Sequence, residues 1–270
     1  WLDYVVWLLN QLVHANGLAN IGARVFGLVY RWHCFWDTEM HMLLFYIYTN
    51  PKAARALLEN RFLSLKGARK RLIEDTKENG GPLYEGAARF PWEGTAPRPR
   101  DTKNPYLRKF LRGLPVIRDF SDFKRCFDFD GGEEQTPNCA LSGKYEKHVN
   151  WDIVYFVNEY ISATGDKKWL LDQGLELITS IVKFAVDPSY VIWSEEKQQY
   201  DTYTIGANEF AECRINGDLG VPNNAFNNLM TKYAIFLMLS KVKELNSSQK
   251  DFFIDKNNLT SEQSYILNKI

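Results

Sequence analysis

Three short segments of the chain place a carboxylate beside an aromatic side chain. They hold Trp36 and Asp37, Trp92 and Glu93, and Glu209, which a phenylalanine follows. Carboxylates accept hydrogen bonds from hydroxyl groups, and aromatic faces cover apolar surface. A carboxylic acid can also protonate the oxygen of a glycosidic bond. Because the segments lie far apart in the sequence, they can form one carbohydrate site only if the fold brings them together.

Each of these residues also has a purely structural interpretation. Glu209 could close a turn after a hairpin, Asp37 could cap a helix or be a satisfied core carboxylate, and Trp92 could anchor a loop. Glu39 is interpreted as a structural residue, for which an arginine is a suitable partner. His148 is also expected to be structural more often than catalytic. The sugar-binding and structural interpretations both stay open at this point.

The composition excludes several classes of protein. The chain has 270 residues with 33 basic and 33 acidic side chains, so its net charge is zero. It therefore lacks the excess of basic residues that is typical of nucleic-acid-binding proteins. No apolar run reaches the length of a membrane span. None of the four cysteines forms a C-x-x-C pair, which argues against zinc and thioredoxin-type chemistry. Motifs for nucleotide binding, serine hydrolases and zinc proteases do not occur.

Apolar periodicity predicts a chain dominated by helices. Thr49, Asn50 and Pro51 predict a break and a restart, with Asn50 as the cap and Pro51 in the first helical position. A short β-hairpin is expected near residues 190–205, and a polar tail without a clear pattern after residue 246. The predicted helices are residues 1–15, 37–48, 51–78, 171–185 and 224–245. A further helix carries the apolar residues of 153–161, and Thr164, Gly165 and Asp166 are expected to end it.

Residues 94–147 have a different character. Five prolines and a Gly-Gly pair interrupt them, which predicts a long loop with short helical pieces. We expect residues 94–131 to be a mostly irregular excursion at the rim of the site, because prolines prevent long helices and central strands. Long loops inside compact domains are usually functional or mobile.

Helices joined by elaborated loops suit an α/α barrel, in which loops at one end of the ring build the site. The sequence therefore predicts an all-α fold of the (α/α)6 barrel type with a short β-hairpin. The helices counted in the sequence make up about half of such a ring. The chain starts at Trp1, inside a helix-like stretch, and this favours a fragment or a processed product.

Several ordered segments resemble glycoside hydrolase family 65, which holds maltose, trehalose, kojibiose and nigerose phosphorylases, acid trehalases and related glucosidases. The resemblance covers about residues 20–240. The segments that carry it are residues 34–39, 48–51, 54–61, 65–69, 90–93, 132–134, 147–153, 164–166, 206–210 and 223–228.

The resemblance implies a catalytic (α/α)6 barrel, normally preceded by a β-sandwich domain and followed by a small β domain. Neither flanking domain is visible in the sequence. Residues 1–270 are accordingly interpreted as one partial barrel domain with a long loop insertion at about 94–147. The resemblance further implies inversion at the anomeric carbon of an α-glucoside.

The resemblance also implies roles for single residues. The family's general acid lies in a Gly-Pro-Asp-Glu-Tyr-His segment and falls on Glu209. Trp36 and Asp37 match the segment around the transferred glucosyl ring, and Trp92 and Glu93 match the family's Pro-Trp-Glu segment. The neighbours of Glu209 depart from the pattern: Ala-Asn replaces Pro-Asp before it, and Phe-Ala replaces Tyr-His after it. These changes could alter the pKa of the acid or the subsite of the leaving sugar.

A disaccharide phosphorylase that releases β-glucose 1-phosphate is the leading interpretation. An α-glucoside hydrolase, of the trehalase or kojibiose type, and a truncated relative that only binds sugar or a partner protein are the alternatives. The substrate would be a disaccharide or oligosaccharide, with inorganic phosphate as co-substrate and no metal or organic cofactor. Dimers are common among such phosphorylases, so a homodimer is one expected assembly, and the expected location is cytoplasmic. The sequence does not determine which disaccharide is used, and a second catalytic residue would lie beyond residue 270.

Overall fold

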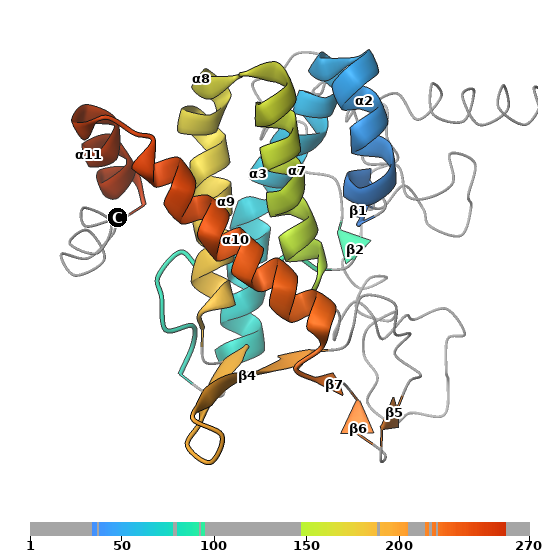
Figure 1. Ribbon diagram of the computed structural model, residues 1–270, viewed down its shortest axis with the longest axis vertical. Coiled ribbons are helices and arrows are strands. Elements are labelled where there is room, and N and C mark those ends of the chain that lie inside the picture. The colour runs from blue at the N-terminus through green and yellow to red at the C-terminus, as the bar shows by residue number, and fades with distance from the viewer. Residues whose placement is uncertain are drawn as a thin grey trace, which may run out of the picture.

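Packed helices make up most of the described part of the chain, with β1 (Cys34–Phe35) and β2 (Glu93–Gly94) beside them and the other strands at one end (Figure 1). The computed structural model describes residues 34–36, 38–77, 80–91, 93–94, 147–187, 190–204, 214–215, 218–219 and 221–257. For most of the strand residues it describes the backbone only. The helix expected at residues 1–15 and most of the loop expected at 94–147 lie outside the described residues.

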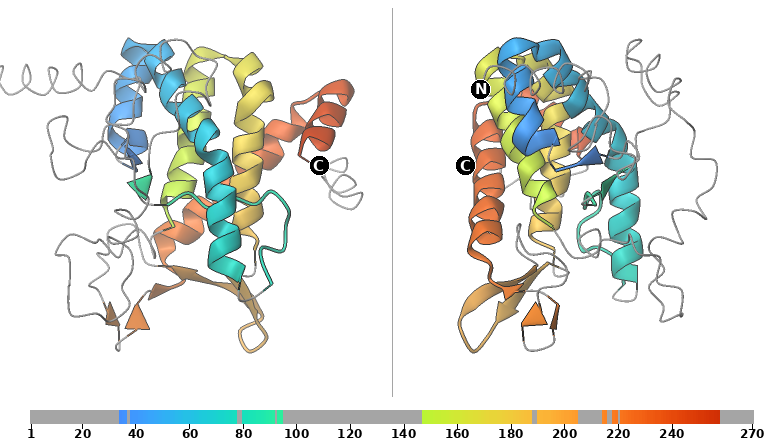
Figure 2. Two further views of the ribbon diagram at one scale, coloured as in Figure 1. Left: turned by 180° about the vertical axis from the view of Figure 1, so that it is seen from behind. Right: turned by 90° about the vertical axis from the view of Figure 1, so that its right-hand side faces the viewer.

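Helix α7 (Val149–Thr164) and helix α9 (Leu175–Ala185) form the middle of the packing. Helix α3 (Pro51–Thr76) covers one side of this pair and α10 (Ala225–Lys243) crosses the other, as Figures 1 and 2 show. Residues 149–154 and 156–157 of α7 are buried, so nearly its whole circumference faces protein. A helix that is apolar all round belongs inside a larger body of helices.

The N-terminal helical stretch consists of η1 (Thr38–Leu43) and α2 (Leu44–Thr49). The chain then breaks at Asn50, whose side chain accepts a hydrogen bond from the Ala53 amide at 3.3 Å. Pro51 occupies the first turn of α3, where its missing N–H has no partner to lose. The break, the cap and the long helix that follows are all confirmed.

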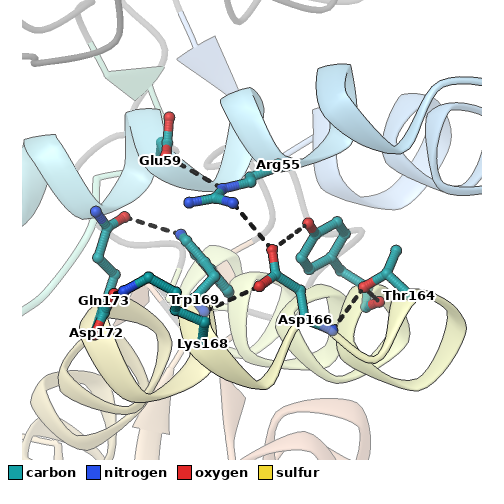
Figure 3. Close-up of polar contacts among 9 residues, drawn as sticks. Arg55, Glu59, Thr164, Asp166, Lys168, Trp169, Asp172 and Gln173 are labelled. Atoms are coloured by element: carbon teal, nitrogen blue, oxygen red, sulfur yellow. Dashed lines mark hydrogen bonds and ion pairs between the residues drawn. The ribbon is translucent and has the colours of Figure 1, made fainter.

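A left-handed residue and a capping carboxylate join α7 to α9 (Figure 3). Gly165 ends α7 with φ of 66°, a conformation that costs glycine little. Asp166 then accepts the Trp169 amide at 3.1 Å and starts α8 (Lys167–Trp169), which continues through η4 (Leu170–Gly174) into α9. Asp166 also contacts Arg55 of α3 at 3.2 Å, so the corner is fixed to the neighbouring helix.

The strands are short and antiparallel. Strand β1 (Cys34–Phe35) pairs with β2 (Glu93–Gly94), and β5 (Arg214–Ile215) pairs with β6 (Asp218–Leu219). Strand β3 (Val191–Ser194) and β4 (Gln199–Thr204) form the predicted hairpin, and β7 (Val221–Pro222) adds to the other edge of β4. The sheet β3-β4-β7 lies at the end of the helices where α9 ends and α10 begins (Figure 1).

One element contradicts the sequence analysis. The sequence after residue 246 indicates only a polar tail with a weak pattern, but Ser247–Lys256 forms helix α11. Asn246 accepts the Gln249 amide at 2.9 Å, and the Gln249 side chain accepts the Asn246 amide at 3.0 Å. This capping box satisfies the backbone amides of Asn246 and Gln249 at the helix start, and so compensates for the weak amphipathic pattern.

The domain boundaries and the insertion at about 94–147 stay predictions, because residues 95–146 lie outside the described ranges. Within those ranges, no helix combines the length and the hydropathy that a membrane crossing needs.

Candidate active site

The β1–β2 pairing joins two of the three aromatic–acid segments. In its register Phe35 lies opposite Glu93, and Cys34 lies opposite Gly94. Trp36 follows β1 directly and is half-buried, and it packs against the hydrophobic core. The Trp36 carbonyl accepts the amides of Glu39 and Met40, both at 3.0 Å, so the indole is carried at the start of η1. Segments almost sixty residues apart thus lie side by side.

The chain that leads into Trp92 runs between α3 and α9 and is tied to both. The Ala88 amide donates to the Ser180 carbonyl at 2.9 Å, and the Arg89 amide donates to the Ala68 carbonyl at 3.3 Å. Ala88 and Phe90 are buried. Backbone hydrogen bonds to two different helices therefore determine where β2 begins.

The first turn of α7 contacts both segments. The His148 ring meets the Trp36 indole edge-on, with centroids 5.3 Å apart and planes at 82°. Asp152, one turn further along, accepts from His148 Nδ1 at 2.8 Å. Asn150 binds the backbone of Phe90 twice, accepting the amide at 2.7 Å and donating to the carbonyl at 3.4 Å. All three side chains of this turn are buried.

Glu39 forms a buried ion pair, as its structural interpretation anticipated. Arg61 of α3 donates Nε to Oε1 at 2.5 Å and Nη2 to Oε2 at 2.8 Å. Burial raises the pKa of the Glu39 carboxyl, and the nearby Asp152 charge raises it further, while the Arg61 guanidinium favours the charged form. Arg61 binds both oxygens of the Glu39 carboxylate inside the core. Glu39 is therefore set apart from the residues that could meet a ligand.

The β4–β7 pairing brackets the segment that contains Glu209. Thr204 lies opposite Val221 and Tyr203 opposite Pro222, so residues 205–220 leave and return at one place. The side-chain amide of Asn223 donates to Asp201 Oδ1 at 2.7 Å and reinforces the pairing of β4 with β7. Both ends of the segment that contains Glu209 are thus fixed at the end of the helices where α10 begins.

The predicted site residues are described to different degrees. Trp36 is described with its side chain, and Glu93 is placed by its backbone in β2. Asp37, Trp92 and Glu209 lie outside the described residues. The structure brings the Trp36 and Glu93 segments together. The sugar-binding roles of Trp36, Asp37, Trp92 and Glu93 and the catalytic role of Glu209 stay predictions.

Sequence reasoning did not single out Asn150 or Asp152. The spacing of His148 and Asp152 was a usable signal, because residues four apart lie on one face of a helix. The double contact of Asn150 with Phe90 joins positions sixty residues apart, and no local pattern reveals it.

No group of three His, Cys, Asp or Glu that could hold a metal ion occurs in the part of the chain that the structure describes. The expectation that no metal or organic cofactor is needed stays a prediction.

Comparison with known proteins places this site within a family. The glycosyl hydrolase family 65 central catalytic domain matches residues 3–104 and 129–269. The kojibiose phosphorylase of Halothermothrix orenii is 31% identical over 246 residues, which cover 88% of this chain and 25% of that protein. The kojibiose hydrolase of Flavobacterium johnsoniae is 28% identical over 203 residues, covering 75% of this chain and 22% of that protein.

A solved structure gives the same fold. It comes from the human microbiome and is provisionally named as a kojibiose phosphorylase. It superimposes with a TM-score of 0.63 at 20% identity, over 93% of this chain and 27% of the other. The all-α fold of the (α/α)6 barrel type with a short β-hairpin is therefore confirmed.

These matches define the class of the chain as the catalytic barrel of a carbohydrate-active enzyme family. The chain belongs to glycosyl hydrolase family 65. It spans about a quarter of the length of the curated relatives that it matches.

Proposed function

We propose that the intact protein is an inverting phosphorylase of α-linked glucosyl disaccharides. The observation that carries this proposal is the β1–β2 ladder, which places Phe35, the neighbour of Trp36, opposite Glu93. Two segments that carry aromatic and acidic residues then lie side by side, and a sugar ring needs that combination of side chains. Relatives named as phosphorylases support the reaction type.

In this mechanism the glucosyl ring lies between the two segments, against the half-buried Trp36. Phosphate attacks the anomeric carbon from the face opposite the glycosidic bond, while Glu209 gives its proton to the departing oxygen. Attack from the opposite face inverts an α-glucoside into β-glucose 1-phosphate. Glu209 needs a raised pKa to stay protonated near neutral pH, and burial beside an aromatic residue would supply it.

A hydrolase is the second candidate, because one relative is named as a kojibiose hydrolase. Water would replace phosphate as the attacking group in the same inverting geometry. The altered neighbours of Glu209 favour a third candidate, a relative that binds sugar without turnover. The homodimer and the cytoplasmic location are further predictions of the phosphorylase proposal.

The test is to incubate the intact protein with kojibiose, nigerose, trehalose and maltose, with and without inorganic phosphate. We expect one of them to give glucose 1-phosphate, with the β anomer identified by NMR. Glucose formation that ignores phosphate would assign the protein to the hydrolases. Binding of sugar without either product would support the non-catalytic candidate.

A further inference from the structure

The first turn of α7 lies where the two sugar-binding segments meet. His148 contacts the Trp36 indole after β1, and Asn150 binds the Phe90 backbone just before β2. These two residues are two positions apart on one helix.

Helix α7 is suited to act as a fixed reference. It packs against α2, α3, α9 and α10, and most of its residues are buried. Trp151, which follows Asn150 directly, is fully buried and donates its Nε1 to Asn227 of α10 at 3.2 Å. A side chain held by such a helix keeps its position better than one carried on a loop.

Each contact is itself held in place. Asp152 accepts from His148 Nδ1 at 2.8 Å, which fixes the plane of the ring that meets Trp36. Asn150 also donates to the Lys147 carbonyl at 2.8 Å, so its amide group is oriented before it reaches Phe90. The two backbone bonds to Phe90 then resemble a step of sheet pairing made by a side chain.

Resting on the proposed function, we propose that His148 and Asn150 are positioning residues that set the separation of the two sugar-binding segments. His148 orients the Trp36 indole, and Asn150 fixes the start of the segment that carries Glu93. Neither residue needs to touch the sugar. Their loss would misplace the groups that do, and displacements of about 1 Å can reduce catalytic efficiency by roughly 100-fold.

The test compares Asn150→Leu with Asn150→Asp in the intact protein. Leucine keeps the volume but loses both bonds to Phe90, whereas aspartate keeps the acceptor for the Phe90 amide. We expect Asn150→Leu to speed hydrogen exchange in the peptide containing Phe90 and to raise the KM for the disaccharide more than it lowers kcat. Asn150→Asp should lie between this variant and the wild type.

A second pair examines the ring contact. His148→Phe keeps an aromatic edge toward Trp36, and His148→Leu does not. We expect glucose affinity, measured by calorimetry, to fall about tenfold or more in His148→Leu and to be partly restored in His148→Phe. Tyr160→Phe, at the other end of α7, is the matched control, since it removes one hydrogen bond of the same helix far from Trp36.

The outcomes separate this inference from the proposed function. A wild-type protein that turns over disaccharide, with variants that keep its KM and glucose affinity, overturns the positioning roles and leaves the function intact. Equal changes in the Tyr160→Phe control would reduce both residues to general stabilisers of α7. A wild-type protein that neither binds nor cleaves sugars removes the proposed function and the positioning roles together.

Discussion

Arg61 holds both carboxylate oxygens of Glu39 inside the core. The two bonds measure 2.5 and 2.8 Å, and each side chain is only 2% exposed. The pair joins α3 to η1, and the Arg61 guanidinium also lies 5.9 Å from the centre of the Phe90 ring. One buried arginine thus connects the helix behind Trp36 with the segment that leads into β2.

Breaking this pair should be more costly than replacing it. Arg61→Met leaves the Glu39 carboxylate buried without its guanidinium, which typically costs about 3–5 kcal/mol of folding stability. The double variant Arg61→Met with Glu39→Leu removes both charges and should recover most of that loss. Thermal unfolding of the intact protein by calorimetry measures both. A double variant no more stable than Arg61→Met would show that apolar side chains cannot replace the pair.

Replacing Glu209 by Gln keeps the shape of the side chain and removes its proton. The rate on a disaccharide with a poor leaving group should fall by roughly two to four orders of magnitude, the usual scale for general acid catalysis. Glucosyl fluoride needs little protonation and should be affected much less. The two rates are measured in the same preparation of the intact protein.

Equal losses on both substrates would indicate that Glu209 supports the structure. Full activity in Glu209→Gln would remove the residue from the mechanism.

Asp166 should be a stability determinant remote from the site. It caps α8, accepts from Tyr160 at 3.0 Å and pairs with Arg55 of α3 (Figure 3). Asp166→Ala loses all three interactions, and we expect a loss of about 1–3 kcal/mol from the lost cap and from the buried Tyr160 left without its acceptor. The midpoint of thermal unfolding measures the effect, while the KM for disaccharide should not change.

Lys168→Ala is the control for Asp166→Ala. Lys168 pairs with Asp172 at 2.6 Å, but it is 83% exposed, so its removal should change stability by less than about 0.5 kcal/mol. If Lys168→Ala lost as much stability as Asp166→Ala, the difference in burial between the two ion pairs would not determine their contribution to stability.

Tyr160 should make the protein less stable at alkaline pH. Burial, reinforced by its hydrogen bond to Asp166, raises the pKa of Tyr160 from 10.0 to about 12. The folded state therefore keeps a proton that the unfolded state loses between these values. Stability from this group is complete below pH 10 and falls as pH rises toward 12. Tyr160→Phe should show a shallower decline over that interval.

The comparison is made by thermal unfolding between pH 9 and 12. Tyr155, Tyr190 and Tyr233 also have raised pKa values, but they are present in both proteins and cancel in the difference. Parallel declines in the two proteins would contradict the assignment to Tyr160.

Local signals in the sequence predicted the helices well. Asn50 and Pro51 marked the start of α3, and Gly165 and Asp166 marked the corner after α7, because caps and left-handed turns depend on a few adjacent residue types. Helix α11 was missed because its capping box, led by Asn246, precedes a helix with little apolar periodicity.

The site was predictable in its segments but not in its contacts. The resemblance to family 65 located the segments of Trp36 and Glu93, and their pairing through β1 and β2 followed only from the fold. The contacts of His148 with Trp36 and of Asn150 with Phe90 depend on how α7 packs against two distant loops. Such pairings have no local sequence signature, whereas family membership could be read from ordered motifs.

The pairing of β4 with β7 has a consequence for how this protein could diversify. Thr204 and Val221 lie opposite each other in this pairing, so the two ends of residues 205–220 are held together. Exchanging this stretch with that of a relative should leave the fold intact while changing the residues next to position 209. We expect residues 205–220 to be among the parts of the barrel that tolerate sequence change best, both in evolution and in protein engineering.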